Sequence, residues 1–419
     1  MMQGRGEGSD LHVQDVHLPS AANSRKALSP KRPQFETGGL ADLFPYYAGF
    51  SYEWARFTLK AHKLTEDSVV LDPWNGSGTT TVAAQSMGVR SVGVDLNPVA
   101  NVVASLRAIK KIPEGIGKPR SSRSLLYDDP LNAWFDARTA ARLRRWQMWC
   151  EDSPTEIKLV TLVALFRVVR NLTAGFQGSN PTWVRRMSPS RPAVSILASD
   201  LDKLVIAERS NIADRISESG LIAAPPVIVK ATASNLPIAD RSADLILTSP
   251  PYLTRIDYAV AYSRELAVLG VDIQKDRSLR GDLMGTTLIR EADARLLDVR
   301  TCAASSLVEQ IAKHQSHASG VYYLKQACQY LSDLTSAFDE LSRVSKAGAV
   351  AVFVVQDSYY KDIPVELAKI CEEEAIIRNW KIVNAEPFDV TRTLTSLNRA
   401  AKNYAKGRVK ETVITMEKQ

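Results

Sequence analysis

A short apolar stretch that ends in a serine, two prolines and a tyrosine is the part of the chain best suited to chemistry. The run 243–247 predicts a buried strand. Pro250 and Pro251 must end that strand, because proline has no N–H for a sheet ladder and holds the residue before it extended. We therefore expect a stiff corner where the carbonyls of Ser249 and Pro250 have few local donors and the Tyr252 ring offers a flat face. Two acceptors beside an aromatic ring suit a planar group that carries an NH2.

A glycine-rich turn lies between an earlier strand and a helix. The strand expected over 68–71 runs into Asp-Pro-Trp-Asn-Gly-Ser-Gly-Thr-Thr. Gly76 and Gly78 permit positive φ and a close approach of the backbone to a ligand. The helix that starts at Thr79 offers unpaired N–H groups at its amino end. This order of strand, glycine turn and helix predicts a ligand site.

Two acidic residues indicate which ligand suits this turn. Asp95 ends the next expected strand, where a carboxylate can accept both hydroxyls of a ribose. Asp72 precedes the glycines, where it would repel a pyrophosphate and attract a cation, and no lysine follows them as in a P-loop. S-adenosylmethionine carries an ammonium and a sulfonium beside its ribose. We therefore expect S-adenosylmethionine at this turn; a nicotinamide dinucleotide is the more distant alternative.

The composition is that of an ordinary globular protein, with 419 residues, 45% hydrophobic and 24% charged. The net charge of +7 favours an anionic partner. The four cysteines include no C-x-x-C pair, which argues against structural zinc and against a disulfide framework. No apolar run approaches the ~20 residues that span a bilayer, and the amino terminus has no apolar signal region. We expect a cytoplasmic protein that makes no contact with a membrane.

Shifts in composition predict three parts of the chain. Residues 1–35 are polar and are expected to form a disordered tail. Residues 36–110 and 226–419 carry the expected strands and both motifs, and form the core. Residues 111–225 predict a mostly helical insertion in which arginines and tryptophans alternate, as at Trp134, Arg138, Arg142, Arg144, Arg145 and Trp146. Such an insertion could hold nucleic acid, but the arginines could equally form a solvated face and the tryptophans a core.

The remaining pattern predicts how the sheet is completed. A long helix is expected over 305–345, followed by a buried strand over 350–355 and a helix over 362–378. Two strands near 380–388 and 409–417 would close the domain as a hairpin. The order of elements predicts an α/β fold with a mostly parallel sheet.

Together these motifs resemble those of bacterial site-specific DNA methyltransferases that modify an amino group. The resemblance rests on Phe44 to Phe50, Asp72 to Thr80, Asp95 to Pro98, Ser249 to Tyr252 and the last hairpin. It implies an α/β fold with a seven-stranded Rossmann-like methyltransferase sheet, a terminal antiparallel hairpin and a mostly helical insertion. In that family the order of the motifs suggests that the insertion is the target-recognition region.

The resemblance also implies which residues form the site. The catalytic corner would consist of Ser249, Pro250, Pro251 and Tyr252, with Tyr252 stacked on an extruded base. The residues implied for S-adenosylmethionine are Tyr47, Phe50, Asp72, Pro73, Gly76, Gly78, Thr79, Thr80, Asp95, Asn97, Ser234 and Asn235. Relatives usually carry Asp where Thr232 stands, so Ser234, Asn235 or a backbone carbonyl would contact the adenine amino group. Methyl transfer would be direct; it requires no metal, and the sequence shows no metal-ligand cluster.

Ser-Pro-Pro-Tyr is more typical of cytosine-N4 enzymes than of adenine-N6 enzymes, so the resemblance favours cytosine. Methylation of cytosine carbon-5 is disfavoured, because none of the four cysteines follows a proline. The implied partners are double-stranded DNA and, as an option, a cognate restriction endonuclease, with the oligomeric state left open. The alternatives are an RNA amino-methyltransferase of the tRNA guanine-N2 type and a non-catalytic DNA-binding protein that keeps the fold.

Overall fold

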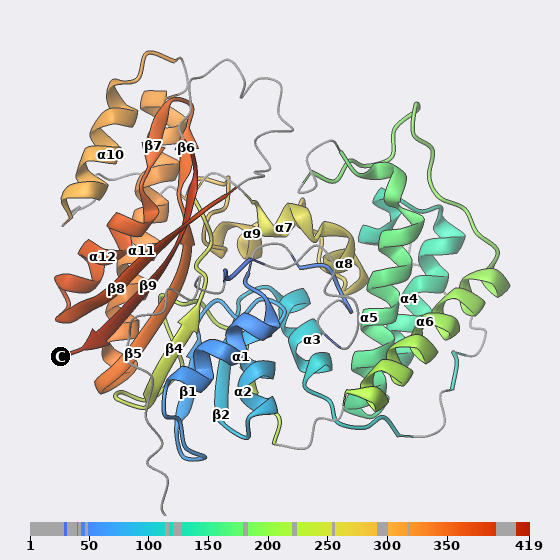
Figure 1. The fold of residues 1–419 in the computed structure, drawn as a ribbon. Coiled ribbons are helices and arrows are strands. Elements are labelled where there is room, and N and C mark those ends of the chain that lie inside the picture. Colours follow the sequence, from blue (N-terminus) through green and yellow to red (C-terminus); the bar gives the residue numbers. More distant parts are fainter. Residues whose placement is uncertain are drawn as a thin grey trace, which may run out of the picture.

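The computed structural model describes residues 29–31, 40, 43–46, 49–113, 117–119, 128–178, 183–219, 224–253, 256–290, 301–316, 319–390 and 408–419. A twisted sheet with helices on both faces makes up one side of the molecule, and a group of long helices lies beside it (Figure 1). The expected tail, 1–35, lies outside the described residues except at 29–31, and so does Tyr47.

The sheet has seven strands in the order β3-β2-β1-β4-β5-β9-β8. The five strands from β3 to β5 run parallel. β9 is antiparallel to both β5 and β8 and forms the terminal hairpin. The strands are β1 (Val69–Asp72), β2 (Arg90–Val94), β3 (Val227–Val229), β4 (Ala243–Thr248), β5 (Ser345–Gln356), β8 (Trp380–Asp389) and β9 (Lys410–Lys418). This is the seven-stranded, mostly parallel α/β sheet with a terminal antiparallel hairpin that the sequence predicted.

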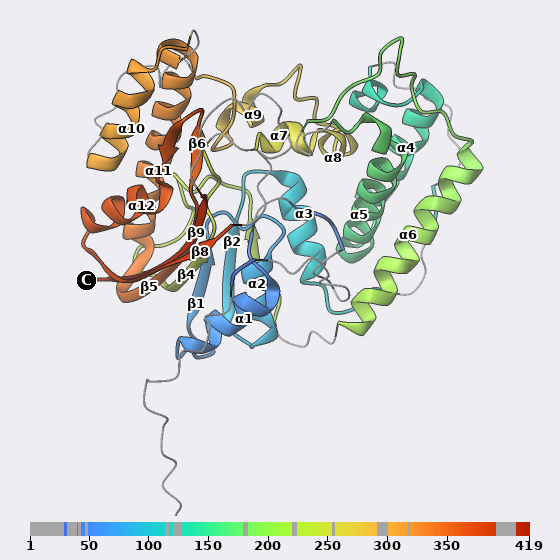
Figure 2. The ribbon, with the colours of Figure 1, turned by 45° about the horizontal axis from the view of Figure 1, so that its top comes forward.

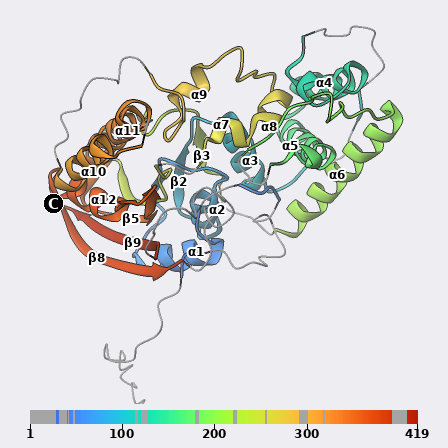
Figure 3. The same ribbon diagram turned by 90° about the horizontal axis from the view of Figure 1, so that it is seen from above.

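The strands bury both faces, because successive side chains point to opposite sides of a sheet. Val70, Leu245 and Leu247 pack with α1 (Tyr52–Ala61) and α2 (Thr79–Ser86). Leu71 and Ile246, one residue along, belong to the core under the helices of the opposite face. Those helices are α10 (Cys302–Lys313), α11 (Leu324–Val344) and α12 (Leu367–Ile376), and Figure 3 shows them across the sheet from α1.

The strand order changes direction at β1, since β2 lies on one side of β1 and β4 on the other. In open parallel sheets, a crevice forms outside the carboxyl ends of the strands at such a point. Asp72 is the last residue of β1, and Ser249 directly follows β4. The topology therefore brings the glycine turn and the proline corner to one edge of the sheet.

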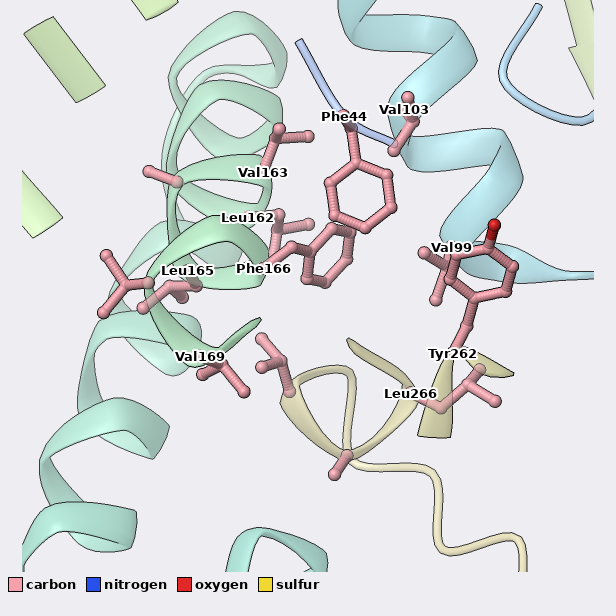
Figure 4. Close-up of a cluster of buried hydrophobic side chains, with 14 of the residues drawn as sticks. Phe44, Val99, Val103, Leu162, Val163, Leu165, Phe166, Val169, Tyr262 and Leu266 are labelled. Atoms are coloured by element: carbon pink, nitrogen blue, oxygen red, sulfur yellow. The ribbon is translucent and has the colours of Figure 1, made fainter. Parts of the chain in front are cut away.

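The described part of the insertion is helical, with α4 (Ala137–Glu151), α5 (Thr155–Leu172) and α6 (Ala198–Glu218). Figure 2 shows these helices beyond α3 (Pro98–Arg107), on the side away from the terminal hairpin. Phe166 of α5 packs against Phe44, with ring centroids 6.0 Å apart. Figure 4 shows both in one buried cluster with Val103 of α3, Tyr262 and Leu266 of α8 (Ser263–Val268). One apolar core thus joins the insertion to the sheet domain. None of the described helices has both the length and the apolar character that a membrane span requires.

Two of the arginines of α4 are internal. Arg142 is buried and donates to both carboxylate oxygens of Asp202, at 2.7 and 2.6 Å. Arg144 is also buried; it donates to Asp129 and to the carbonyls of residues 267 and 268. Trp134 and Trp146 are 2% and 0% exposed. The core interpretation therefore holds for the two tryptophans. For Arg142 and Arg144 neither the solvated face nor a nucleic-acid surface holds, because both are buried in ion pairs.

The predicted residue ranges of two helices are wrong. The helix predicted over 305–345 is interrupted, because α10 ends at Lys313 and α11 starts only at Leu324. At the break, the ring Nδ1 of His314 accepts from the backbone N–H of Ser316 at 3.1 Å. The helix predicted over 362–378 starts later, at Leu367, because β6 (Ser358–Tyr360) and β7 (Ile363–Val365) form a hairpin first. Pro364 lies in β7 and cannot belong to a helix interior.

Candidate cofactor and catalytic site

A cavity of about 260 Å³ opens at the sheet edge where β1 and β4 end. Residues from the glycine turn and from the proline corner line the same cavity. Of the residues predicted for the site, the lining includes Phe50, Asp72, Pro73, Gly76, Thr79, Asp95, Ser234, Ser249 and Pro251. The space between the two motifs is therefore open rather than filled with packed side chains.

Other predicted site residues lie behind the cavity wall. Gly78 has a φ of 83° and directly precedes α2. Thr80 is buried and donates to Asp72 Oδ2 at 2.7 Å. Asn97 caps α3, where its side-chain oxygen accepts from the Val99 N–H at 3.0 Å. Asn235 is likewise absent from the lining and donates its backbone N–H to the Thr232 carbonyl at 3.1 Å.

Asp72 is a buried carboxylate held by three donors. Its Oδ1 accepts from the Thr248 hydroxyl at 2.6 Å and from the Trp74 N–H at 3.2 Å, and its Oδ2 accepts from the Thr80 hydroxyl at 2.7 Å. Each bond favours the ionised form, but burial outweighs them and raises the pKa of Asp72 from 3.8 to about 6. The carboxylate is thus well oriented but lacks a countercharge among these donors. A cationic ligand in the cavity would supply one.

Asp95 is the second carboxylate of the cavity, and it is partly exposed. Its Oδ2 accepts from the Gly76 N–H at 2.9 Å and its Oδ1 from the Asn97 N–H at 2.8 Å. Each oxygen has a second lone pair, so the geometry leaves capacity for the two hydroxyls of a ribose. Burial also raises the pKa of Asp95 to about 6, and the charge of Asp72 adds to the rise. Two oriented carboxylates beside a glycine turn fit a nucleoside that carries positive charge.

Affinity for such a ligand is expected to rise with pH through about 6. Because burial raises both pKa values, the folded protein holds these protons more tightly than the unfolded chain does. As the pH rises from about 4 to 6, ionisation of the two carboxyls therefore lowers the free energy of unfolding of the apoprotein. Over the same range their ionised forms attract a cation more strongly. Calorimetric titration with S-adenosylmethionine from about pH 5 to 8 measures the trend. A pH-independent affinity would contradict the assignment of both carboxylates to a cation.

Gly78→Ala is expected to lower the free energy of unfolding by about 2–4 kcal/mol, and Gly88→Ala by only about 1 kcal/mol. Both glycines have positive φ, at 83° and 75°. At Gly78 a new Cβ would also lie 2.9 Å from the Cβ of Ala104 and 3.1 Å from Thr81 Oγ1, whereas at Gly88 nothing lies within 4 Å. Urea denaturation of the three proteins measures the difference. Equal losses would mean that α3 does not press against the glycine turn.

The proline corner brings oxygens and an aromatic ring close together. The Ser249 hydroxyl lies 3.4 Å from the Tyr252 hydroxyl. The Pro251 carbonyl accepts from the buried Tyr330 hydroxyl of α11 at 2.7 Å, which anchors the corner to the core. No donor among the described residues reaches the carbonyl of Pro250. Pro250 and Tyr252 are absent from the lining residues, whereas Ser249 and Pro251 line the cavity. The corner therefore keeps acceptor oxygens for a ligand at its edge.

Several lining residues were missed. Tyr46 lines the cavity and stacks on Tyr262 with ring centroids 4.6 Å apart; its neighbour Tyr47 was predicted instead. The aromatic segment marked the region, but no local signal distinguishes the two tyrosines. The other missed lining residues are Gly49, Trp74, Asn75, Ser77, Leu96, Ala231, Thr232, Ala233, Tyr258, Asp282, Leu283, Met284, Arg290 and Asp333. Those after Tyr258 come from segments without a recognisable motif, so only the fold brings them to the site.

The sequence is also similar to known proteins. A family model described as DNA methylase, of the N6_N4_Mtase type, matches residues 20–103, which contain the glycine turn and Asp95. The type II methyltransferase M.BsoBI of Geobacillus stearothermophilus is 25% identical over 392 residues, covering 78% of this chain and 77% of that protein. The type II methyltransferase M.AvaI of Nostoc sp. is 22% identical over 403 residues, covering 84% of this chain and 81% of that protein. Among solved structures, a geranyl diphosphate methyltransferase gives a TM-score of 0.34 at 8% identity, covering 88% of this chain and 80% of that chain.

Proposed function

Because the chain belongs with the amino-methyltransferases of bacterial restriction-modification systems, we propose that it methylates the exocyclic amino group of a flipped base at a specific sequence in double-stranded DNA. Cytosine N4 is favoured over adenine N6. S-adenosylmethionine is the cofactor, and it supplies the methyl group on a positively charged sulfur. The observation that carries this function is the shared cavity, which is lined by the carboxylates Asp72 and Asp95 and by Ser249 and Pro251 of the corner.

The corner would prepare the amine for attack. The lone pair of an aromatic amine is delocalised into its ring, so the nitrogen is a poor nucleophile. The Ser249 hydroxyl and the Pro250 carbonyl would accept its two hydrogens and favour a pyramidal nitrogen, whose lone pair then points at the methyl donor. Tyr252 would stack on the extruded base and offset part of the few kcal/mol that unstacking costs. Holding amine and methyl donor in line contributes a large share of the rate.

A basic residue of the cavity wall supports cytosine as the target. Arg290 lines the cavity and donates to Asp333 Oδ1 at 2.6 Å, which orients its guanidinium. Beside its amino group cytosine has two acceptors, N3 and O2, whose spacing matches the parallel donors of a guanidinium. On its Watson–Crick edge adenine has only N1 as an acceptor, because N7 lies on the other side of its amino group. Arg290 would therefore hold the pyrimidine ring while Ser249 holds the amine.

Arg290→Lys is expected to lower kcat/KM for a cytosine target about 10-fold, because lysine keeps the charge but lacks the planar fork. The measurement is steady-state methyl transfer to duplex DNA. Asp244→Asn removes another partly exposed ion pair, with Lys346, and serves as the control. If the lysine variant methylated its target as well as the parent protein, Arg290 would have no role in holding the base.

Methylation-aware sequencing of DNA from cells that express the protein tests the proposed function directly. We expect one short sequence motif to carry a modified cytosine N4. Cells that express the Ser249→Ala variant should lack the mark. Methylated tRNA with unmodified DNA would favour the RNA alternative. A protein that binds DNA and leaves both nucleic acids unmodified would favour the non-catalytic alternative.

A further inference from the structure

A basic and aromatic segment between α5 and α6 has no role in the site described above. Residues 183–197 contain three arginines and no carboxylate. Three of its apolar side chains are exposed: Trp183 is 63% exposed, Met187 51% and Leu197 72%. An exposed tryptophan beside cations is uncommon on a protein surface unless it contacts a partner.

The backbone of this segment is held in place. The Trp183 carbonyl accepts from the Gly178 N–H at 2.9 Å, and the Arg185 N–H donates to the Phe176 carbonyl at 2.9 Å. The ring N–H of buried Trp134 donates to the Arg185 carbonyl at 2.7 Å. A fixed backbone that directs a large ring and cations to solvent is a preorganised surface, since little ordering remains to be done on binding.

The arginines of this segment differ from the two buried arginines of α4. Arg142 and Arg144 are buried in ion pairs, as described above. Arg185 is exposed, and Arg186 keeps 45% of its side chain exposed although it lies 3.6 Å from Asp272. Solvent therefore reaches Arg185 and Arg186 of this segment, whereas on α4 it reaches Arg138 but neither Arg142 nor Arg144.

The segment is linked to the cavity through one stretch of chain. Asp272, the partner of Arg186, precedes α9 (Ser278–Asp282) by a few residues. Asp282 and the two residues after it line the cavity. In Figure 2 the segment between α5 and α6 runs along the same upper edge of the molecule as α7 (Tyr258–Ala261), α8 and α9. A duplex on this edge could place one nucleotide in the cavity.

We propose that residues 183–197 form a DNA-docking strip, on which Arg185 and Arg186 contact phosphates and Trp183 packs against a base or sugar beside the target nucleotide. This inference rests on the proposed DNA substrate. Arginines supply the phosphate contacts that dominate affinity for a duplex. An exposed aromatic face suits a nucleotide that has been unstacked beside an extruded base. An acidic protein surface would match the charge but would not need an exposed indole.

The test is fluorescence anisotropy of a labelled duplex at several salt concentrations. The double change Arg185→Gln and Arg186→Gln should reduce the slope of log K against log salt by about 2, because each phosphate contact contributes about 0.9. Trp183→Ala should weaken binding about 10-fold with a smaller change in slope. Matched controls are Lys369→Gln with Lys381→Gln, which removes two exposed cations elsewhere, and Phe57→Ala, which removes a ring that is 61% exposed on α1.

Calorimetric binding of S-adenosylmethionine shows that each variant is folded. If the arginine double variant fails this check, it is replaced by Arg185→Lys with Arg186→Lys, which should keep most of the salt slope. If the parent protein binds duplex and the strip variants bind as the controls do, the docking strip is overturned while the proposed function stands. If the parent protein binds no duplex at all, both are overturned.

Discussion

Asp72→Asn is expected to weaken binding of S-adenosylmethionine about 10- to 100-fold, which corresponds to the loss of a charge-assisted contact. The same change should leave the apoprotein at least as stable as its parent. Asparagine can keep the local bonds: its oxygen replaces Oδ1 as the acceptor from Thr248 and Trp74, and its NH2 can donate to Thr80 Oγ1. That hydroxyl already lies 3.0 Å from the Leu247 carbonyl, to which it can donate.

The stability expectation follows from the raised pKa. A carboxyl whose pKa rises from 3.8 to about 6 on folding destabilises the folded apoprotein by about 3 kcal/mol at pH 7. A neutral side chain of the same shape removes that cost. Urea denaturation of the apoproteins and calorimetric titration of the cofactor measure the two effects.

A control at an exposed carboxylate distinguishes local from general charge effects. Asp240 is 71% exposed and pairs with Arg343, so Asp240→Asn should leave cofactor affinity unchanged. An Asp72→Asn protein that bound S-adenosylmethionine as tightly as its parent would show that this carboxylate does not face the cation. A protein that unfolded would show instead that the carboxylate is needed for the fold.

The parts of the site that could be predicted are those encoded within a few consecutive residues. The glycine turn that begins at Asp72, and the corner that begins at Ser249, are recognisable because each combines a strand end with residues that restrict or free the backbone. Parallel pairing then brings them together, since the carboxyl ends of parallel strands lie at one edge. The sheet order could be predicted for the same reason.

The parts that could not be predicted depend on partners far away in the sequence. Whether Arg144 faces solvent or the core depends on Asp129 and on the carbonyls of the last two residues of α8. Arg290 reaches the cavity from a polar stretch and is oriented by Asp333 of α11. Helical periodicity alone also gave no sign of the break between α10 and α11, because a few polar residues interrupt the apolar pattern only briefly.

Tyr252→Ala is expected to lower kcat/KM for duplex DNA about 10- to 100-fold, because stacking of a base on an aromatic ring contributes ~1–3 kcal/mol. The ring is partly buried against the core under α11, and its hydroxyl lies 3.4 Å from Ser249 Oγ. Tyr252→Phe should retain most of the activity, since it keeps the flat face of the ring that would stack on the base. Methyl transfer from labelled cofactor measures all three proteins.

A second substrate separates stacking from a general loss of structure. A mismatch opposite the target base lowers the cost of extruding it. If Tyr252 acts by holding the extruded base, the alanine variant should regain much of its rate on the mismatched duplex, while the parent protein should gain little. In most complexes of the parent protein the base is already held out of the helix, so the mismatch can raise the rate of the parent protein only a little. An alanine variant with the same deficit on both duplexes would place the role of Tyr252 in shaping the corner around Ser249 rather than in contact with the base.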